Sequence, residues 1–131
     1  MSMNARLLAQ VSTQFVGLHR WPDAPPNVYF LAYPHRHRFL VRVDVPQLHD
    51  NRDVEYLTLQ AAVESVVATL PHTRRDDLVV CPDYGTLSCE QMARHIGHTL
   101  RARFGFSTLV CAVSEDGENG ASVVVTRGDD A

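Results

Sequence analysis

The chain contains no lysine: all twelve of its basic residues are arginines, and fifteen acidic residues outnumber them to give a formal charge of −3. Proteins that neutralise nucleic-acid phosphates or an anionic membrane need an excess of basic charge, so we expect neither partner. The sequence also lacks an apolar run of the ~20 residues that cross a membrane, and its first residues lack the layout of a signal peptide. We therefore expect a cytoplasmic protein with a small ligand.

Cysteine is also scarce. The three cysteines, Cys81, Cys89 and Cys111, show neither C-x-x-C spacing nor a short secreted context, which argues against a disulfide framework and against a thiolate zinc cluster. Hydrophobic residues make up 45% of the 131 residues and charged residues 21%, as in an ordinary globular protein. A chain of this length is expected to form one domain over residues 1–131.

Alternation of apolar and polar residues predicts two strands, over 7–19 and 34–45. Between them, three prolines in the stretch 21–27 predict a loop without regular structure. Because successive side chains of a strand point to opposite faces, the second strand has two distinct faces. One carries His35, His37, Phe39, Val41, Val43 and Val45, and the other carries Arg36, Arg38, Leu40, Arg42 and Asp44.

The rest of the chain predicts two helices and two further strands. Apolar residues at helical spacing indicate a helix over 56–70, and a capping box opens a second helix over 88–104. The stretch 74–86 between them is expected to be irregular. Strands over 109–115 and 121–126 flank D-G and N-G turn signals. The order ββααββ predicts an α+β domain with a four-stranded antiparallel sheet and two helices on one face, whose unpaired edges favour oligomerisation.

Three histidines are the strongest candidates for a metal-binding site. His35 and His37 lie on one face of a strand, about 7 Å apart along the chain, which is within reach of one metal ion. His19 ends the preceding strand, and a hairpin across the proline-rich loop would bring it opposite the pair. Three imidazoles with an open fourth position are typical of a catalytic zinc site. The alternative is that these histidines are only exposed or hydrogen-bonded.

The same residues resemble the 6-pyruvoyl-tetrahydropterin synthase and 6-carboxy-tetrahydropterin synthase family, which has the tunnelling fold. The resemblance covers roughly residues 11 to 126, and no single motif is verbatim. The similar segments are Phe15 to His19 (aromatic-x-x-x-His in the family), His35-Arg36-His37 (H-G-H), Val54-Glu55-Tyr56 (hydrophobic-Asp-aromatic), Leu87-Ser88-Cys89-Glu90-Gln91-Met92-Ala93 (P-T-x-E-N-x-A) and Glu115 (the Glu that closes the third strand).

This resemblance implies a lyase-like enzyme that binds zinc through His19, His35 and His37 and acts on a pterin-like or guanine-derived nucleotide. It assigns Glu115 to the substrate, because a carboxylate can accept two parallel hydrogen bonds from the ring N–H and amino group of a pterin or guanine. An exposed acid beside a turn is the alternative for Glu115. The resemblance also implies a homo-oligomer, trimeric or hexameric, in which Glu115 would join another subunit's zinc.

Departures from the family pattern leave the activity open. Leu31 stands where the family has its catalytic cysteine, and Pro71 replaces the aspartate that precedes the family's histidine. His72 is then the remaining candidate acid or base, unless it is a solvated loop residue. A non-catalytic module that captures a nucleotide or pterin, or a structural metal protein, is the alternative to an enzyme. On the opposite strand face, Arg36, Arg38 and Arg42 are expected to be solvated or at an interface, with a substrate phosphate as the alternative.

Overall fold

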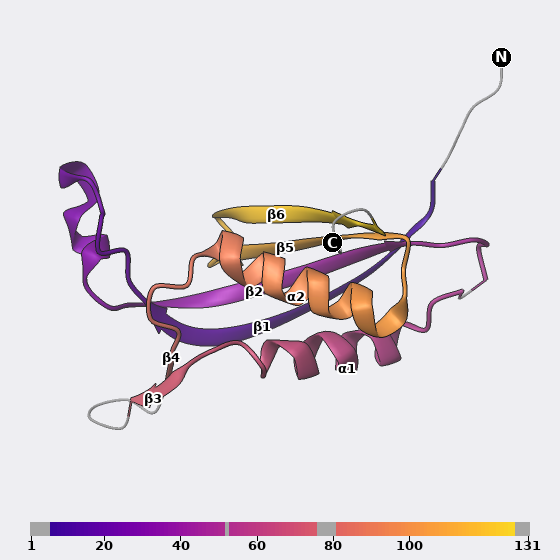
Figure 1. The fold of residues 1–131 in the computed structure, drawn as a ribbon, viewed down its shortest axis with the longest axis horizontal. Helices are drawn as coiled ribbons and strands as arrows, with labels where there is room; N and C mark the ends of the chain where they lie inside the picture. Colours follow the sequence, from indigo (N-terminus) through magenta and orange to yellow (C-terminus); the bar gives the residue numbers. More distant parts are fainter. Residues whose placement is uncertain (1–5, 52, 76–80, 128–131) are drawn as a thin grey trace, which may run out of the picture.

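The computed structural model describes residues 6–51, 53–75 and 81–127. Its core is a curled antiparallel sheet of long strands, with both α-helices packed on one face (Figure 1). The chain order is β1 (Leu8–His19), η1 (Pro26–Ala32), β2 (His35–Pro46), α1 (Tyr56–Val67), β3 (Thr73–Arg75), β4 (Cys81–Asp83), α2 (Cys89–Phe104), β5 (Thr108–Glu115) and β6 (Asn119–Thr126). The α+β class predicted from the sequence is confirmed.

The sheet has six strands in the order β3-β4-β1-β2-β5-β6, so the prediction of a four-stranded sheet is wrong. The four predicted strands form its antiparallel centre. The two additional strands lie in the stretch 74–86 that was expected to be irregular, apart from residues 76–80, which fall outside the described residues. β4 joins β1 in parallel at one residue pair, Leu18 and Asp83, and β3 pairs antiparallel with β4. Strands of three residues are too short to show an alternating pattern.

The alternation in β2 determines which side of the sheet forms the core. Phe39, Val41, Val43 and Val45 are completely buried, whereas Arg36, Arg38 and Arg42 are exposed. The buried side chains pack under α1, which contacts β1, and under α2, which contacts β5 and β6. The side of the sheet that bears the arginines has no helix over it in the described part of the chain (Figure 1).

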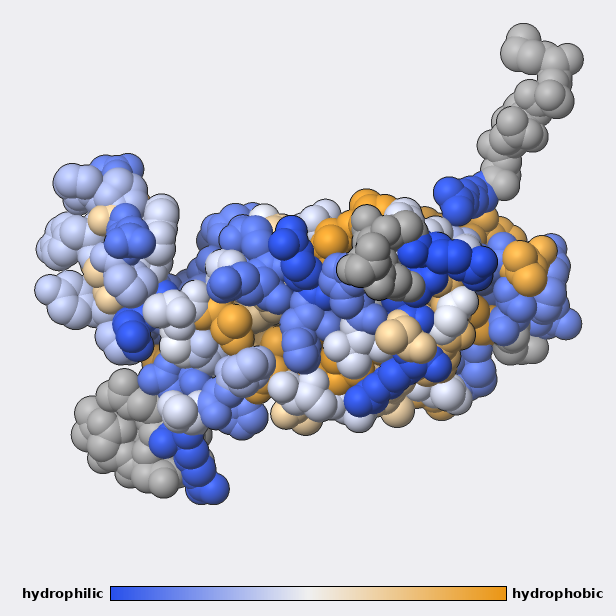
Figure 2. Space-filling model, viewed as in Figure 1, coloured by the Kyte–Doolittle hydropathy of each residue, from blue (hydrophilic) through white to orange (hydrophobic). Residues whose placement is uncertain are grey.

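Both helices begin where the sequence predicts. The Glu55 carboxylate caps α1 by accepting the backbone N–H groups of Leu57 and Thr58. The predicted capping box of α2 is present between Ser88 and Gln91. α1 ends three residues earlier than predicted, ahead of Pro71. No helix in residues 6–51, 53–75 and 81–127 is long and apolar enough to cross a membrane, and the outer surface of the helices is mainly hydrophilic with separate apolar patches (Figure 2).

The proline-rich connection between β1 and β2 contains a short 3-10 helix, η1, that projects beyond the end of the sheet (Figure 1). The prediction that all of 21–27 is irregular is therefore wrong for its last residues, because η1 begins at Pro26. Pro26 starts this helix, because a proline ring fixes φ near the helical value and needs no N–H partner in a first turn. The N–H of Trp21 donates to Leu31 O at 2.7 Å, which closes the base of the projection.

Candidate metal centre

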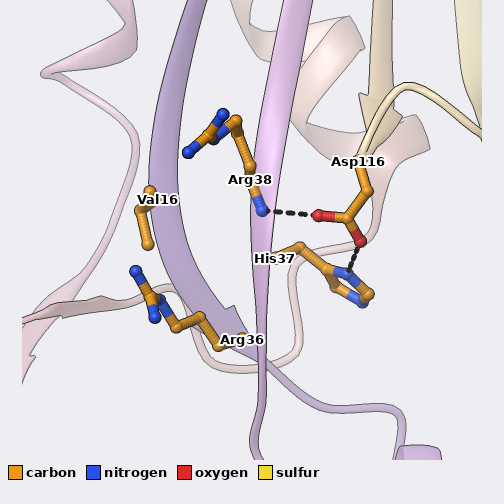
Figure 3. Close-up of a pocket in the computed structure, with 5 residues that line it drawn as sticks. All are labelled: Val16, Arg36, His37, Arg38 and Asp116. Carbon is orange, nitrogen blue, oxygen red and sulfur yellow. Dashed lines mark hydrogen bonds and ion pairs between the residues drawn. The ribbon is translucent and has the colours of Figure 1, made fainter.

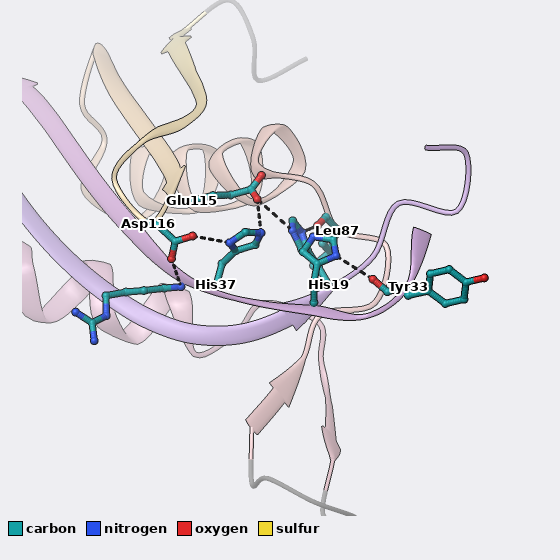
Figure 4. Close-up of polar contacts among 8 residues, drawn as sticks. His19, Tyr33, His37, Leu87, Glu115 and Asp116 are labelled. Atoms are coloured by element: carbon teal, nitrogen blue, oxygen red, sulfur yellow. Dashed lines mark hydrogen bonds and ion pairs between the residues drawn. The ribbon is translucent and has the colours of Figure 1, made fainter. Parts of the chain in front are cut away.

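The register of β1 and β2 brings the three histidines together. His19 lies directly opposite His35, and His37 lies opposite Gly17, so all three imidazoles share the side of the sheet that faces the core. The ring centroids of His19 and His35 are 4.6 Å apart, those of His35 and His37 5.0 Å, and those of His19 and His37 5.3 Å. The expected placement of His19 opposite the pair is confirmed, and Figure 4 shows His19 and His37 beside Glu115.

Each imidazole is oriented by an oxygen that accepts a hydrogen bond from its Nδ1–H. His19 Nδ1 lies 2.8 Å from Leu87 O, and His35 Nδ1 lies 2.9 Å from Tyr33 O. His37 Nδ1 lies 2.7 Å from Asp116 Oδ2. Backbone carbonyls and an ionised carboxylate only accept, so in the neutral rings each Nδ1 carries the hydrogen and each Nε2 presents a lone pair. Metal-binding histidines are typically held in this way.

Glu115, at the end of β5, completes the cluster from within the same chain. Its Oε2 lies 2.5 Å from His37 Nε2 and 3.6 Å from His19 Nε2. His37 Nε2 is buried and makes no hydrogen bond to any described residue, despite the short distance to the carboxylate. A nitrogen lone pair and a carboxylate oxygen repel each other at this distance unless a proton or a metal ion lies between them. The resemblance implies that Glu115 joins another subunit's zinc, whereas the fold brings Glu115 to the histidines of its own chain.

The four residues offer a donor set that fits a divalent metal ion. One ligand atom from each of His19, His35, His37 and Glu115 can be chosen so that all four lie within 4.8 Å of one another. Imidazole and carboxylate are the ligands that zinc accepts in catalytic sites, and iron and nickel also bind imidazole. The cluster could therefore hold a metal ion through three nitrogens, with Glu115 as a fourth ligand or as a neighbour of the open position.

The environment of His35 favours its neutral form. Burial lowers the pKa of the His35 imidazole, and the neighbouring His19 and His37 lower it further, while the Tyr33 carbonyl and Glu115 act in the opposite direction. The net shift is downward. A neutral imidazole can donate its lone pair to a metal, so this environment suits a ligand.

A pocket of about 480 Å³ opens beside the cluster. Its wall combines residues of the η1 projection, the start of α2 and the β5–β6 turn: His19, Arg20, Trp21, Leu31, His35, Thr86, Leu87, Ser88, Cys89, Glu90, Glu115, Asn119 and Gly120. A volume of this size suits a small organic ligand. Sequence reasoning missed Trp21, although its position two residues after His19 is a signal that could have identified it.

Cys89, which the sequence assigns to neither a disulfide framework nor a thiolate zinc cluster, also lies in this wall. Burial, together with the negative charges of Glu115 and Glu90, raises the pKa of its thiol to about 12. The thiol is therefore protonated at neutral pH and is a poor base or nucleophile. Leu31, which stands where the family has its cysteine, lines the same pocket without an ionisable group.

The structure does not bring His72 to the cluster. His72 Nδ1 donates to Leu70 O at 2.7 Å, and its ring lies against Tyr84 with centroids 5.6 Å apart. Tyr84 in turn contacts Phe39, and Phe39 contacts His19 and His37. Two aromatic rings thus lie in sequence between His72 and the metal-binding candidates of its own chain.

Asp116 lies beside the four-residue cluster and contacts His37. The sequence identified it only as part of a turn. It has a left-handed backbone conformation, with φ of 57°, which asparagine also tolerates. Its Oδ2 accepts from His37 Nδ1 at 2.7 Å, and its Oδ1 accepts from the backbone N–H of Arg38 at 3.0 Å. These hydrogen bonds lower the pKa of Asp116, with the Arg38 N–H as the largest cause. One carboxylate thus orients the His37 ring and also binds the β2 backbone at the next residue, Arg38.

We expect Asp116→Asn to weaken metal binding by roughly 10- to 100-fold, the usual effect of losing a residue that orients a ligand. Asparagine keeps the turn but has one acceptor oxygen for two donors, so the orientation of His37 is lost. Competition with a chromophoric chelator measures the affinity. Asp44→Asn is the matched control, because Asp44 pairs with Arg42 on the same strand, away from the histidines. Equal affinities for wild type and Asp116→Asn would contradict the assignment.

Comparison with known proteins adds information on the fold alone. No family model matches the chain, and no protein of curated function is significantly similar to it. Among solved structures, an uncharacterized protein from Wolinella succinogenes, WS1659, superposes with a TM-score of 0.51 at 12% sequence identity, covering 92% of this chain and 99% of that one. The chain therefore shares its overall fold with WS1659 along almost the whole length of both proteins.

Proposed function

We propose that this protein binds zinc in a tunnelling fold and acts on a pterin-like or guanine-derived nucleotide, similarly to the 6-pyruvoyl- and 6-carboxy-tetrahydropterin synthases. One observation carries this proposal: His19, His35 and His37, each oriented through its Nδ1, converge with Glu115 beside a pocket of about 480 Å³. The four central antiparallel strands and the two helices on one face support the fold assignment.

In this proposal, different residues of the chain bind the metal, bind the ring and form the pocket wall. A bound zinc ion would supply Lewis-acid polarisation of an oxygen on the substrate. The histidines hold the metal, and the Glu115 carboxylate is placed to accept the ring N–H and amino group of the ligand. Trp21 and Leu31 form the apolar part of the pocket wall. Recognition of the ring and positioning of its side chain at the metal thus use separate residues.

A non-catalytic binding module is the second candidate. It is favoured because Leu31 has no ionisable group, the Cys89 thiol is protonated, and the His72 ring lies against Tyr84. The Glu90 carboxylate in the pocket wall is then the remaining candidate base. Such a module would use the same histidines and Glu115 to capture a nucleotide or pterin without turnover.

Three measurements test the proposal and distinguish the enzyme from the binding module. Mass spectrometry of the ligand released from purified protein, with calorimetric titration of guanosine triphosphate and of dihydroneopterin triphosphate, tests whether a pterin or guanine ring binds. Turnover of dihydroneopterin triphosphate by the zinc-loaded protein tests catalysis. Binding without turnover supports the module, and binding with turnover supports the enzyme. A zinc-loaded protein that binds neither compound would overturn both.

We expect Glu115→Ala to weaken ring binding by about 100-fold, since two hydrogen bonds to a charged group are lost. Calorimetric titration with the ligand that binds the wild type measures this loss. Glu118→Ala is the matched control, because Glu118 lies in the same turn, is exposed and lines neither described pocket. If both variants bind the ring as the wild type does, Glu115 is a metal ligand or a turn residue and not the ring anchor.

We also propose that the protein assembles into trimeric rings, paired as a hexamer. In the described residues, β6 and β3 end the sheet, so their outer backbone groups have no partner strand, and such edges are usually covered or paired. Light scattering at micromolar concentration should give a mass of about three or six times 14.6 kDa. A stable 14.6 kDa monomer would contradict this expectation.

A further inference from the structure

A second pocket lies on the helix-free side of the sheet, away from the large pocket at the metal centre. It has a volume of about 380 Å³ and is lined by Val16, Arg36, His37, Arg38 and Asp116 (Figure 3). Arg36 and Arg38 are alternate residues of β2, so their side chains project from the same face. In Figure 3 both guanidinium groups extend from β2 toward β1, on either side of Val16.

These two guanidinium groups have no acidic partner in residues 6–51, 53–75 and 81–127. Arg42, on the same face of the same strand, differs in this respect, because its Nε lies 3.1 Å from Asp44 Oδ1. Asp116 is the acid in the described pocket wall, but its two oxygens accept from His37 Nδ1 and from the backbone N–H of Arg38. The charge of Arg38 is only the smallest cause of the lowered pKa of Asp116. Both guanidinium groups therefore lack a salt bridge to a described residue and are available to a ligand.

We propose that Arg36 and Arg38 bind a phosphate or carboxylate group on the helix-free face of the sheet. The planar guanidinium presents paired N–H donors that match two oxygens of such a group, so two arginines on one face can hold one anion from two sides. The site lies on the opposite side of β2 from the Nε2 atoms of His35 and His37, which points to a second ligand group and not to one that also reaches the metal. This inference does not depend on the proposed pterin or guanine substrate.

The test is a titration with inorganic phosphate and, separately, with acetate, at constant ionic strength. Nuclear magnetic resonance follows the Val16 methyl groups and the arginine Nε–H groups. We expect saturable shifts, and a weakening of at least about tenfold in Arg36→Gln/Arg38→Gln. Arg42→Gln, the matched control, should bind as the wild type does. Arg36→Lys/Arg38→Lys keeps the charge without the paired donors and should bind with intermediate affinity.

The two anions identify the source of the ligand group. Saturation by phosphate alone supports a phosphoryl ligand, and saturation by acetate as well supports a carboxylate ligand. To exclude phosphate held by a metal ion, the titration is repeated on protein stripped of metal with a chelator, in which the Val16 shifts should persist. Shifts that do not saturate, or an equal loss in Arg42→Gln and in the double glutamine variant, would overturn the proposal.

Discussion

Replacing His35 and His37 together by alanine should reduce bound zinc from about one ion per chain to almost none. The change removes two of the three nitrogens in the cluster, and the remaining His19 and Glu115 are too few to hold zinc against dilution, since zinc sites in proteins use three or four protein ligands. Elemental analysis after exhaustive desalting gives the stoichiometry. No other group of residues in the described part of the chain offers this donor set.

A second pair of histidines provides the control for this experiment. His95 and His98 lie on α2, and His95 contacts Thr69 of the α1 end at 3.0 Å. His95→Ala/His98→Ala removes the same number of imidazoles from the chain without touching the cluster, so its zinc content should equal that of the wild type. Unchanged zinc in the His35/His37 variant, or a comparable loss in the control, would show that the metal binds elsewhere.

The cluster could be predicted from the sequence because it rests on local rules. Period-two alternation puts His35 and His37 on one face of a strand. The full antiparallel pairing of β1 with β2 then sets His19 directly opposite His35. This register is strongly determined, because a shift by one residue would turn buried valines such as Val41 and Val43 toward solvent. The same burial that defines the core therefore also aligns the three imidazoles.

Other parts of the site depend on contacts that no local pattern encodes. Asp116 was visible only as a D-G turn, and its role follows from the pairing of β2 with β5, which brings that turn to His37. The strands β3 and β4 form by pairing at the end of β1, and their three-residue length leaves no periodic signal. Trp21 and Cys89 reach the pocket from two segments that the sequence alone could not place side by side.

The position of His72 does not fit the role that the family resemblance assigns to it. The resemblance assigned it as acid or base from its place after the first helix. In the structure its ring is stacked at an angle on Tyr84, and Gly17 leaves room for Tyr84 because a Cβ there would meet the Tyr84 ring at 2.3 Å. His72 contacts Tyr84 and not the cluster, and the rings of Tyr84 and Phe39 connect it to His19 and His37. The described contacts therefore do not support a catalytic role for His72 at the cluster of its own chain.

The last expected result is a slow reaction in a protein that binds its ligand well. In the proposed function, binding uses the histidines and Glu115. Proton removal in the synthases that the sequence resembles uses a cysteine, and Leu31 stands in its place here. General base catalysis contributes about 100- to 10,000-fold, so turnover of dihydroneopterin triphosphate should be lower by that factor than in a synthase that retains the cysteine. Kinetic assays on zinc-loaded protein, with binding measured in parallel, separate the rate from the affinity.

Leu31→Cys alone should restore little of this activity. The new thiol would lie in the same pocket wall as Trp21, and Pro71 would still stand where the synthases that the sequence resembles have an aspartate. The pair of histidine and carboxylate that would activate the thiol is therefore missing. Leu31→Ser is the matched control, because it introduces a similar polar group that forms no thiolate. Rapid turnover by the wild type would identify another base. Glu90 is the candidate, because it is the carboxylate in the described pocket wall that does not belong to the cluster. Loss of that turnover in Glu90→Gln, with zinc and ring binding retained, would then assign the step to Glu90.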